Sequence, residues 1–360
     1  MGVEICVEGL TKSFGHQVIW QDVSLTLPAG EVSVMLGPSG TGKSVFLKTL
    51  VGLLKPDRGS IRIAGTDITE LREHDLYEVR KLFGVLFQDG ALFGSMNLYD
   101  NIAFPLREHT RKTESDIRRI VLDKMDMVGL IGAEEKLPGE ISGGMRKRAG
   151  LARALVLDPE IILFDEPDSG LDPVRVAYLN QLIVDLNAQI DATFLIVTHD
   201  IASARQVPDN IGLLFRRELV MFGPREELLT SDEPVVRQFL GGRMQGPIGM
   251  AEEKDAAQVE EELAGLGSGD DVVVETPPRL LPSPGVTRPP RWQAIADREA
   301  EPHRKPVPPG EADTAPAPAQ APDPDPDPNP SREGAPDLTA DSAAGTKPAA
   351  KPAPAVEADA

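Results

Sequence analysis

The chain contains 360 residues with a formal net charge of −20, and neither its first 240 residues nor its last 120 carry an excess of Lys and Arg. This excludes a general affinity for nucleic acid or for an anionic lipid surface, because both need clustered basic side chains. The single cysteine, Cys6, permits no internal disulfide and suits a reducing cytoplasm. The lack of a basic-apolar leader and of any run of eighteen apolar residues predicts a chain that is neither exported nor membrane-spanning.

Composition also divides the chain into two unequal parts. The last 120 residues hold 22 of the 33 prolines but a single aromatic residue, Trp292. A segment so poor in large apolar groups cannot offset the entropy lost when its backbone is ordered. We therefore expect a folded unit over residues 1–240 and a largely disordered tail, rich in Pro, Ala, Asp and Glu, over residues 241–360.

Alternating apolar and other residues near the N-terminus indicate half-buried strands. The alternation involves Val3, Ile5 and Val7, and again Ile61 and Ile63 after a turn at Gly59. These two stretches predict a small antiparallel layer.

Three continuous apolar runs instead predict strands that are buried on both faces of a parallel sheet. They cover Val32–Leu36, Ile161–Phe164 and Phe194–Val197. Between the last two runs, apolar side chains from Val176 to Leu186 are spaced like one face of a helix. Strand, helix and strand in this order predict an α/β core. A helical insertion is expected over about residues 90–155, with helices over Glu114–Met127 and Arg146–Val156.

The tail offers little regular structure. Ala251–Leu266 is rich in Ala and Glu and is compatible with transient helix, whereas the alternating Asp and Pro of residues 323–330 exclude helix and central strand. Two interpretations stay open for the tail: an inert linker, or an interaction module that regulates or recruits a complex.

A glycine-rich motif typical of phosphate binding follows the first buried strand. It fits the pattern G-x-x-x-x-G-K-[ST] and consists of Gly37, Pro38, Ser39, Gly40, Thr41, Gly42, Lys43 and Ser44. Glycines let backbone N–H groups turn toward phosphate oxygens, and the following helix points its positive end at the same place. We expect Lys43 to reach the β- and γ-phosphates of a nucleotide and the Ser44 hydroxyl to bind Mg²⁺.

Two acidic residues end the second buried strand, at the edge of the sheet where α/β proteins bind ligands. Asp165 is expected to hold Mg²⁺, directly or through water, and Glu166 to orient and polarise the attacking water. A purely structural role is the alternative, since acids commonly end strands. The pairing with the phosphate loop favours nucleotide hydrolysis.

Two more strings, Ile141-Ser142-Gly143-Gly144-Met145 and Ser169-Gly170-Leu171-Asp172, occur together with His199. With them, the chain resembles the ATP-binding cassette family over nearly all of residues 3–240. The resemblance implies a P-loop NTPase core with an antiparallel β-subdomain and a helical subdomain, and ATP and Mg²⁺ as ligands. In that family two cassettes close head to tail, so that each ATP lies between the phosphate loop of one and the signature of the other. A second cassette, in a homodimer, is therefore expected as a partner, and Ser142, Gly143 and Gly144 would face its γ-phosphate.

The resemblance also implies roles for four single residues. Gln88 is similar to the loop glutamine that touches magnesium and water, and His199 is similar to the switch histidine at the γ-phosphate. Asp172 is similar to the aspartate that communicates between the two sites, and Phe14 to the aromatic residue that stacks on adenine. The implied catalytic residues are thus Glu166, His199 and Gln88, and the implied metal ligands are Ser44, Gln88 and Asp165.

Three positions depart from the family pattern. Phe14 stands where Tyr is usual, and Ile141 and Met145 replace the Leu and Gln that usually begin and end the signature. The ring face of Phe14 and the phosphate-facing serine and glycines are retained. We therefore expect adenine binding and the chemistry to persist.

Several stretches resemble the cassettes that serve Mla and Mce lipid transporters, in particular the Mce-associated ATPase of actinobacteria: Gln88–Phe93, Asn101–His109, Gly144–Arg148 and Asp165–Pro173. The resemblance implies a permease of the YrbE type, Mce substrate-binding proteins as indirect partners, and lipid, sterol or fatty acid as cargo. It also implies a cytoplasmic protein held peripherally on the inner face of the plasma membrane by the permease. Ala91, Leu92, Phe93 and Phe104 fall where the family receives the permease's coupling helix, and a core role for them stays open.

Two alternatives to this lipid transport motor remain. One is an ATP-binding cassette that serves another substrate class. The other is a cassette protein that acts on nucleic acid or ribosomes without transport. Such proteins usually carry two cassettes per chain or long coiled coils, and the acidic body of this chain also disfavours binding to a phosphate backbone, so no nucleic-acid partner is expected.

Overall fold

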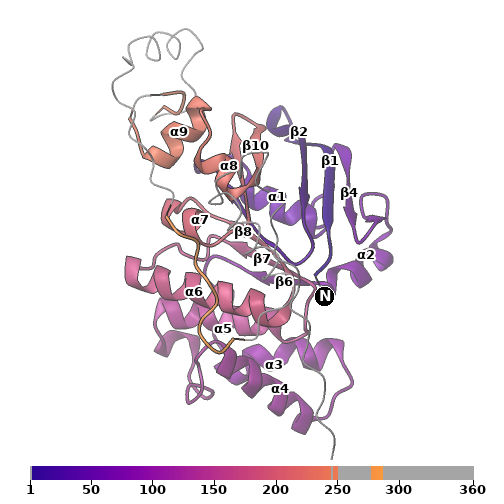
Figure 1. Ribbon diagram of the computed structural model, residues 1–360. Coiled ribbons are helices and arrows are strands. Elements are labelled where there is room, and N and C mark those ends of the chain that lie inside the picture. The colour runs from indigo at the N-terminus through magenta and orange to yellow at the C-terminus, as the bar shows by residue number, and fades with distance from the viewer. Residues whose placement is uncertain (1, 245, 250–276, 287–360) are drawn as a thin grey trace, which may run out of the picture. The chain divides into compact units, whose positions relative to one another are not determined.

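The computed structural model describes residues 2–244, 246–249 and 277–286 (Figure 1). Two sheets and the helices around them make up this part of the chain. The expected transient helix over Ala251–Leu266, the Asp-Pro repeat over residues 323–330 and Trp292 lie outside the described residues.

A six-stranded sheet forms the centre, in the order β10-β9-β3-β8-β7-β6. Its strands β9, β3, β8, β7 and β6 run parallel, and β10 is antiparallel to β9. The α/β core predicted from the three apolar runs is thus confirmed, whereas β6, β9 and β10 were not predicted. The strands are β3 (Val32–Leu36), β6 (Phe83–Leu86), β7 (Ile161–Asp165), β8 (Thr193–Val197), β9 (Asn210–Phe215) and β10 (Glu218–Pro224).

A four-stranded antiparallel sheet, in the order β2-β1-β4-β5, lies beside the central sheet. Ile5 pairs with Ile63 and Val7 with Ile61, so the antiparallel layer predicted from their alternation is confirmed. Gly59 was expected in a turn before this strand, but it lies inside the strand. These strands are β1 (Ile5–Phe14), β2 (Gln17–Leu27), β4 (Arg58–Ile63) and β5 (Thr66–Asp67).

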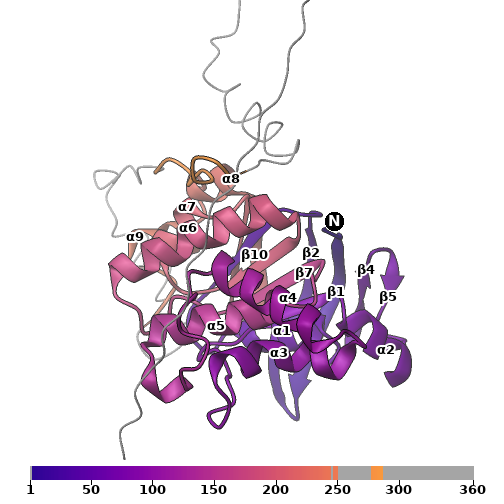
Figure 2. The ribbon, with the colours of Figure 1, turned by 90° about the horizontal axis from the view of Figure 1, so that it is seen from below.

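Alternate residues of the central strands face two different cores. Met35, Leu163 and Leu195 belong to the core shared with the antiparallel sheet and the first helix. Their neighbours Val34 and Ile162 belong to the core on the opposite face, where the longer helices pack. Burial on both faces explains why these strands read as continuous apolar runs. Figures 1 and 2 show the antiparallel sheet on one side of the central sheet and α5 and α6 on the other.

The helices α3, α4, α5, α6 and α7 begin after residues whose side chains accept hydrogen bonds from free N–H groups of the first turn. Thr113 caps the predicted helix over Glu114–Met127, and its hydroxyl accepts a hydrogen bond from the Asp116 N–H. The helix predicted to begin at Arg146 begins three residues earlier, at Gly143. The helices are α1 (Lys43–Leu50), α2 (Glu73–Arg80), α3 (Leu98–His109), α4 (Glu114–Met127), α5 (Gly143–Leu155), α6 (Pro173–Ile190), α7 (Ile201–Gln206), α8 (Arg225–Leu229) and α9 (Pro234–Gly241), with a short 3-10 turn over Pro138–Glu140.

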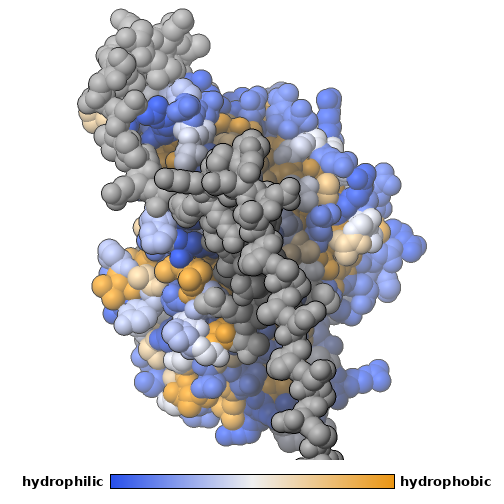
Figure 3. Space-filling view, viewed as in Figure 1, coloured by the Kyte–Doolittle hydropathy of each residue, from blue (hydrophilic) through white to orange (hydrophobic). Residues whose placement is uncertain are grey.

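Most of the surface in Figure 3 is hydrophilic, and apolar side chains appear there in separate patches, including the region of the helices α3 to α6. Within the described ranges, no helix combines the length and the apolar character that crossing a bilayer requires.

One segment of the tail, residues 277–286, is hydrogen-bonded to the folded unit and is here called the strap. The Leu280 N–H donates to the Gln206 carbonyl at 2.9 Å, and the Ser283 hydroxyl donates to Asp185 of α6 at 2.7 Å. Arg279 forms an ion pair with Asp209, and the two side chains are only 4% and 6% exposed. The strap therefore links α6, α7 and the start of β9.

We expect a chain that ends at Gly249 to be less stable than a chain that ends at Val286. Removing Arg279 leaves the buried Asp209 carboxylate without this cation, and loss of one partner of a buried ion pair costs about 3–5 kcal/mol. The loss should lower the melting temperature by roughly 10 °C, measured by thermal denaturation of both truncated chains. Equal melting temperatures would show that the strap contributes nothing to stability.

Candidate functional site

The phosphate loop joins β3 to α1 at the carboxyl ends of the parallel strands of the central sheet. Gly42 precedes α1 with φ +85°, in the left-handed region that favours glycine. A Cβ atom there would lie 2.3 Å from the Ile19 side chain and 3.0 Å from Trp20. Backbone conformation and close approach thus both require glycine, and Trp20 supports the loop from β2.

The predicted phosphate-binding lysine is buried within this loop. The Lys43 ammonium is 5% exposed and donates to the carbonyls of Gly37 at 2.7 Å and Pro38 at 2.9 Å. Burial lowers its pKa, while the carboxylates of Glu166 and Asp165 act in the opposite direction. The charges of Asp165 and Glu166 therefore favour the protonated form of Lys43.

Two of the predicted metal ligands touch each other. The Ser44 hydroxyl donates to Asp165 Oδ1 at 2.9 Å, across 121 positions of sequence. Burial raises the pKa of Asp165, and the hydrogen bond from Ser44 opposes the rise. The pair joins the start of α1 to the end of β7.

The predicted base and the predicted switch residue also lie side by side. Glu166 Oε1 lies 3.5 Å from His199 Nδ1, and the Glu166 side chain is 22% exposed. Glu166 has φ +47°, which is unusual for a non-glycine residue. Its N–H donates to the Val197 carbonyl at 2.8 Å, which ties the loop after β7 to the end of β8.

The third predicted metal ligand has another partner in this structure. The Gln88 amide donates to the Ser169 hydroxyl at 3.0 Å, so it contacts the loop after Glu166. Gln88 follows β6, the strand next to β7 in the sheet.

The signature residues cap a helix. Ser142 is the N-cap of α5, its hydroxyl accepts from the Met145 N–H at 3.2 Å, and Gly143 and Gly144 form the first turn. Asp172 caps α6 in the same way, through the N–H groups of Val174 and Arg175. Among the hydrogen bonds of the described residues, none joins Ser142 or Asp172 to the phosphate loop of the same chain.

The predicted adenine-stacking residue is exposed and apart from these groups. Phe14 ends β1 and is 47% exposed, with the Lys12 ammonium 5.4 Å from its ring centre. Among the described residues, no hydrogen bond, ion pair or ring contact joins Phe14 to Asp165 or Glu166.

The four apolar residues predicted to receive a permease differ in how far they are buried. Leu92 packs against the core and Phe104 is half-buried, whereas Ala91 and Phe93 are exposed. The Phe93 and Phe104 rings lie 5.1 Å apart. The exposed Phe93 ring therefore lies against the half-buried Phe104 ring.

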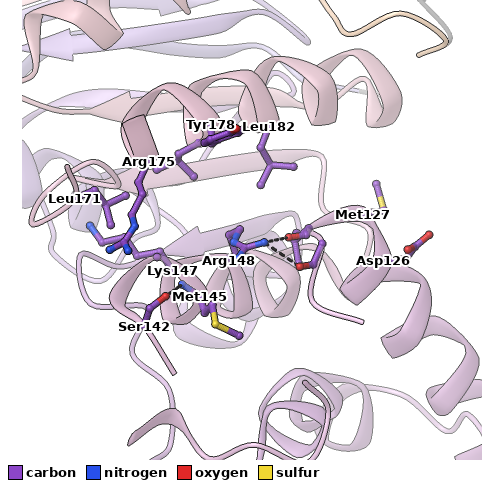
Figure 4. A pocket seen from close by; sticks show the side chains of 14 residues that line it. Asp126, Met127, Ser142, Met145, Lys147, Arg148, Leu171, Arg175, Tyr178 and Leu182 are labelled. Atoms are coloured by element: carbon purple, nitrogen blue, oxygen red, sulfur yellow. Dashed lines mark hydrogen bonds between the residues drawn. The ribbon is translucent and has the colours of Figure 1, made fainter. Parts of the chain in front are cut away.

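A cavity of about 500 Å³ lies beside the signature, between α4, α5 and α6 (Figure 4). Ser142, Lys147 and Arg148 of α5 line one side, and Tyr178 of α6 lines the other. Arg148 donates to two carbonyls at the end of α4, each at 2.9 Å.

Sequence reasoning missed three residues that hold this site together. Lys147 is 5% exposed and donates to main-chain carbonyls after Glu166, and Asp168 accepts a hydrogen bond from Thr198, next to His199. Only Lys147 left a signal in the sequence, as a charged residue at a helix position that faces the core. Such a position cannot be recognised before the helix register is known.

Known proteins match these features. The family model described as ABC transporter matches residues 20–169. The chain is 70% identical over 305 residues to the probable ribonucleotide transport ATP-binding protein mkl of Mycobacterium tuberculosis, which covers 83% of this chain and 84% of that protein. It is 43% identical over 242 residues to the intermembrane phospholipid transport system ATP-binding protein MlaF of Haemophilus influenzae, which covers 67% of this chain and 92% of that protein. A match over 83% of the chain necessarily spans the strap.

Solved structures are also similar. The dimeric structure of the ATP-binding cassette MJ0796 bound to ADP and Pi matches with a TM-score of 0.57 and 29% identity, over 61% of this chain and 98% of that chain. The cbiO1 protein of Clostridium perfringens, part of the transporter complex cbiONQ, matches with a TM-score of 0.60 and 26% identity, over 67% of this chain and 96% of that chain.

Proposed function

Because the chain belongs to the ABC transporter family as an ATPase of the Mla type, we propose that it powers lipid transport through an integral-membrane permease. The predicted fold class, the ATPase activity and the binding of ATP follow from this membership. The observation that carries the lipid proposal is the similarity to MlaF, which extends over 92% of that protein. The proposal includes a division of the chain into two parts. These are a cassette over residues 1–240, with a helical subdomain over about 90–155, and a tail over 241–360.

The ATP site would be built from the phosphate loop and the ends of the neighbouring strands. Backbone N–H groups of the loop and the Lys43 ammonium would bind the phosphates, since the loop and the start of α1 offer donors where a nucleotide carries negative charge. Phe14, at the end of β1, would stack on adenine.

The donor set fits a magnesium ion. Ser44 and Asp165 supply a hydroxyl and a carboxylate 2.9 Å apart, and hard oxygen donors are the ligands that Mg²⁺ prefers. Mg²⁺ usually keeps several waters and binds one or two carboxylates together with phosphates, so these two side chains could be its main protein ligands. When bound, Mg²⁺ would neutralise charge that develops on the phosphates. Gln88 would reach it by leaving Ser169.

Hydrolysis would use Glu166, which follows β7, and His199, which follows β8. The Glu166 carboxylate would orient the attacking water and accept its proton, and His199 would donate a hydrogen bond to the γ-phosphate. Their side chains lie 3.5 Å apart, so both could act on the same phosphate group.

A second copy of the chain would complete each site. Ser142 and the following glycines point free N–H groups out of the start of α5, and such helix starts bind anions. Because no hydrogen bond among the described residues joins them to their own phosphate loop, we assign them to the γ-phosphate of a partner cassette. Asp172 would then lie at the interface, between the two sites. The dimeric structures of MJ0796 support this arrangement.

The loop before α3 would receive the permease. Phe93 is 44% exposed, and its main chain is held by buried Asn101, which accepts from the Phe93 N–H at 2.7 Å. The Asn101 amide donates to the carbonyls of Phe93, Met96 and Asn97. This rigid apolar protrusion suits a helix end of a membrane partner. We propose a YrbE-type permease, with Mce proteins as its substrate-binding partners, and thus a location at the cytoplasmic face of the plasma membrane.

The name of the mkl relative supplies a second candidate substrate, a ribonucleotide. One experiment separates the two: purify tagged Glu166→Gln protein from native membranes with ATP present and identify what accompanies it. A multi-span permease with Mce-like proteins and bound lipid would support the proposal. A permease with a nucleotide-binding partner would favour ribonucleotide transport, and ribosomes or nucleic acid without a permease would refute transport.

A further inference from the structure

We infer that Lys147 is a positioning residue for ATP hydrolysis, which holds the main chain around Glu166 in a fixed place relative to the signature serine Ser142. The inference rests on the proposed function, because it assumes that Glu166 is the base and that Ser142 faces a partner's ATP.

Three carbonyl oxygens converge on one ammonium group. Lys147 Nζ donates to the carbonyls of Glu166 at 3.3 Å, Pro167 at 2.7 Å and Ser169 at 2.5 Å. An ammonium has three N–H donors, so this arrangement uses all of them. A buried charge is tolerated when it is fully hydrogen-bonded in this way. The arrangement is therefore a specific binding site for the loop after β7, built by α5.

This loop needs an outside support. Between the end of β7 at Asp165 and the start of α6 at Pro173 it has no regular structure, and Glu166 holds a left-handed backbone conformation. Near Leu171 the loop borders the cavity of about 500 Å³ beside α5, so packing on that side is open (Figure 4). The hydrogen bonds of Lys147 therefore determine much of the distance between the loop and α5.

The opposite side of the loop is tied to the switch histidine. Asp168 is 6% exposed and accepts a hydrogen bond from the hydroxyl of Thr198, the residue before His199. Its other oxygen, Oδ1, has no hydrogen-bond partner among the described residues. Burial lowers the pKa of Lys147, and the nearby carboxylate of Asp168 acts against that shift. A continuous chain of contacts thus runs from the signature helix through Lys147, the loop and Thr198 to His199.

This series of contacts begins on the same helix that carries the signature serine. Ser142 caps α5, and Lys147 lies in the second turn of the same helix. A shift of α5 when Ser142 meets a partner's ATP would be passed directly to Glu166 in its own site. Lys147 would thereby couple closure of one site to the geometry of the other.

The test compares steady-state ATP hydrolysis by the full-length chain with Lys147→Met and Lys147→Gln. Methionine keeps the length but donates no hydrogen bond, while glutamine keeps two donors. We expect kcat to fall roughly 10- to 100-fold in Lys147→Met and less in Lys147→Gln, with KM for ATP within about threefold, because misplacement of a reacting group by about 1 Å costs up to this much. Rates are expressed per ATP-binding site, titrated with a fluorescent ATP analogue, so that unfolded protein does not contribute.

Lys124→Met is the matched control. Lys124 is 8% exposed and bonds Asp158 at 2.7 Å, and neither residue belongs to the loop after β7. We expect its kcat to stay within about twofold of the unmodified chain. Unchanged kcat in Lys147→Met, a change in KM instead of kcat, or an equal loss in Lys124→Met would each overturn the inference. Full hydrolysis by Glu166→Gln would instead refute the proposed catalytic role on which it rests.

Discussion

Glu166→Gln protein is expected to bind ATP with normal affinity but to hydrolyse it roughly 100- to 10,000-fold more slowly, the range that a general base contributes. The amide cannot accept a proton from water, whereas the Lys43 contacts to the phosphate loop do not involve Glu166. Since ATP would persist between two cassettes, the variant should accumulate as a dimer. Phosphate release and light scattering after size-exclusion chromatography measure both effects.

Two controls define this result. Glu160 lies before β7, at the end opposite Glu166, and Glu160→Gln should hydrolyse ATP at the normal rate. Adding Ser142→Arg to Glu166→Gln should return the ATP-bound protein to monomer, because the bulky side chain blocks the start of α5. Hydrolysis at the normal rate by Glu166→Gln would show that another group is the base, and a persistent dimer with Ser142→Arg would refute the assignment of the signature to a partner's ATP.

Lys43→Ala protein is expected to lose ATP affinity by about 100-fold or more. In this structure the ammonium donates to the carbonyls of Gly37 and Pro38, and it would turn these donors to the phosphates of a bound nucleotide. A hydrogen bond to a charged group contributes about 1.5–3 kcal/mol, so two such bonds would account for a loss of this size. Without the ammonium, the carboxylates of Asp165 and Glu166 would also repel the phosphates. Titration with a fluorescent ATP analogue measures the affinity.

The exposed Lys55, which lies beyond the end of α1, provides the comparison for this variant. Lys55→Ala changes the net charge by the same amount, so a general electrostatic effect would weaken ATP binding in both proteins. Affinity within about threefold of normal in Lys43→Ala would contradict the assigned role.

Local patterns predicted three of the central strands that are buried on both faces, although β9, which is also buried along its whole length, was missed. Val32–Leu36 and Phe194–Val197 read as strands because no polar residue larger than Ser interrupts them. β10 was missed because its side chains are mostly half-buried, which leaves no clear periodicity. α3 was missed because Pro105 lies inside it, and proline normally argues against a helix interior.

Motifs predicted the candidate site where the chemistry depends on residue type and spacing. The contacts of Ser44 with Asp165 and of Glu166 with His199 join residues that the motifs had already singled out. The roles of these residues stay predictions until variants are measured. Lys147 could not be found in this way, because its partners are main-chain carbonyls, and these carry no signature in a sequence.

Composition likewise could not predict the strap. Pro277–Val286 holds four prolines in ten residues, more than the tail average of 22 in 120, and its attachment depends on one buried ion pair and a few hydrogen bonds. Such contacts involve single residues, and average composition does not register them.

The Asn101 hydrogen bonds bear on how this cassette could evolve. They fix the backbone of the loop before α3 without using any of the loop's own side chains. If the proposed permease docks on this loop, substitutions at exposed Phe93 or Ser95 would change the surface that the permease contacts, while the Asn101 hydrogen bonds would keep the backbone of the loop in place. A duplicated gene would need few changes to adopt a new permease, so partner choice and ATP chemistry are free to diverge separately.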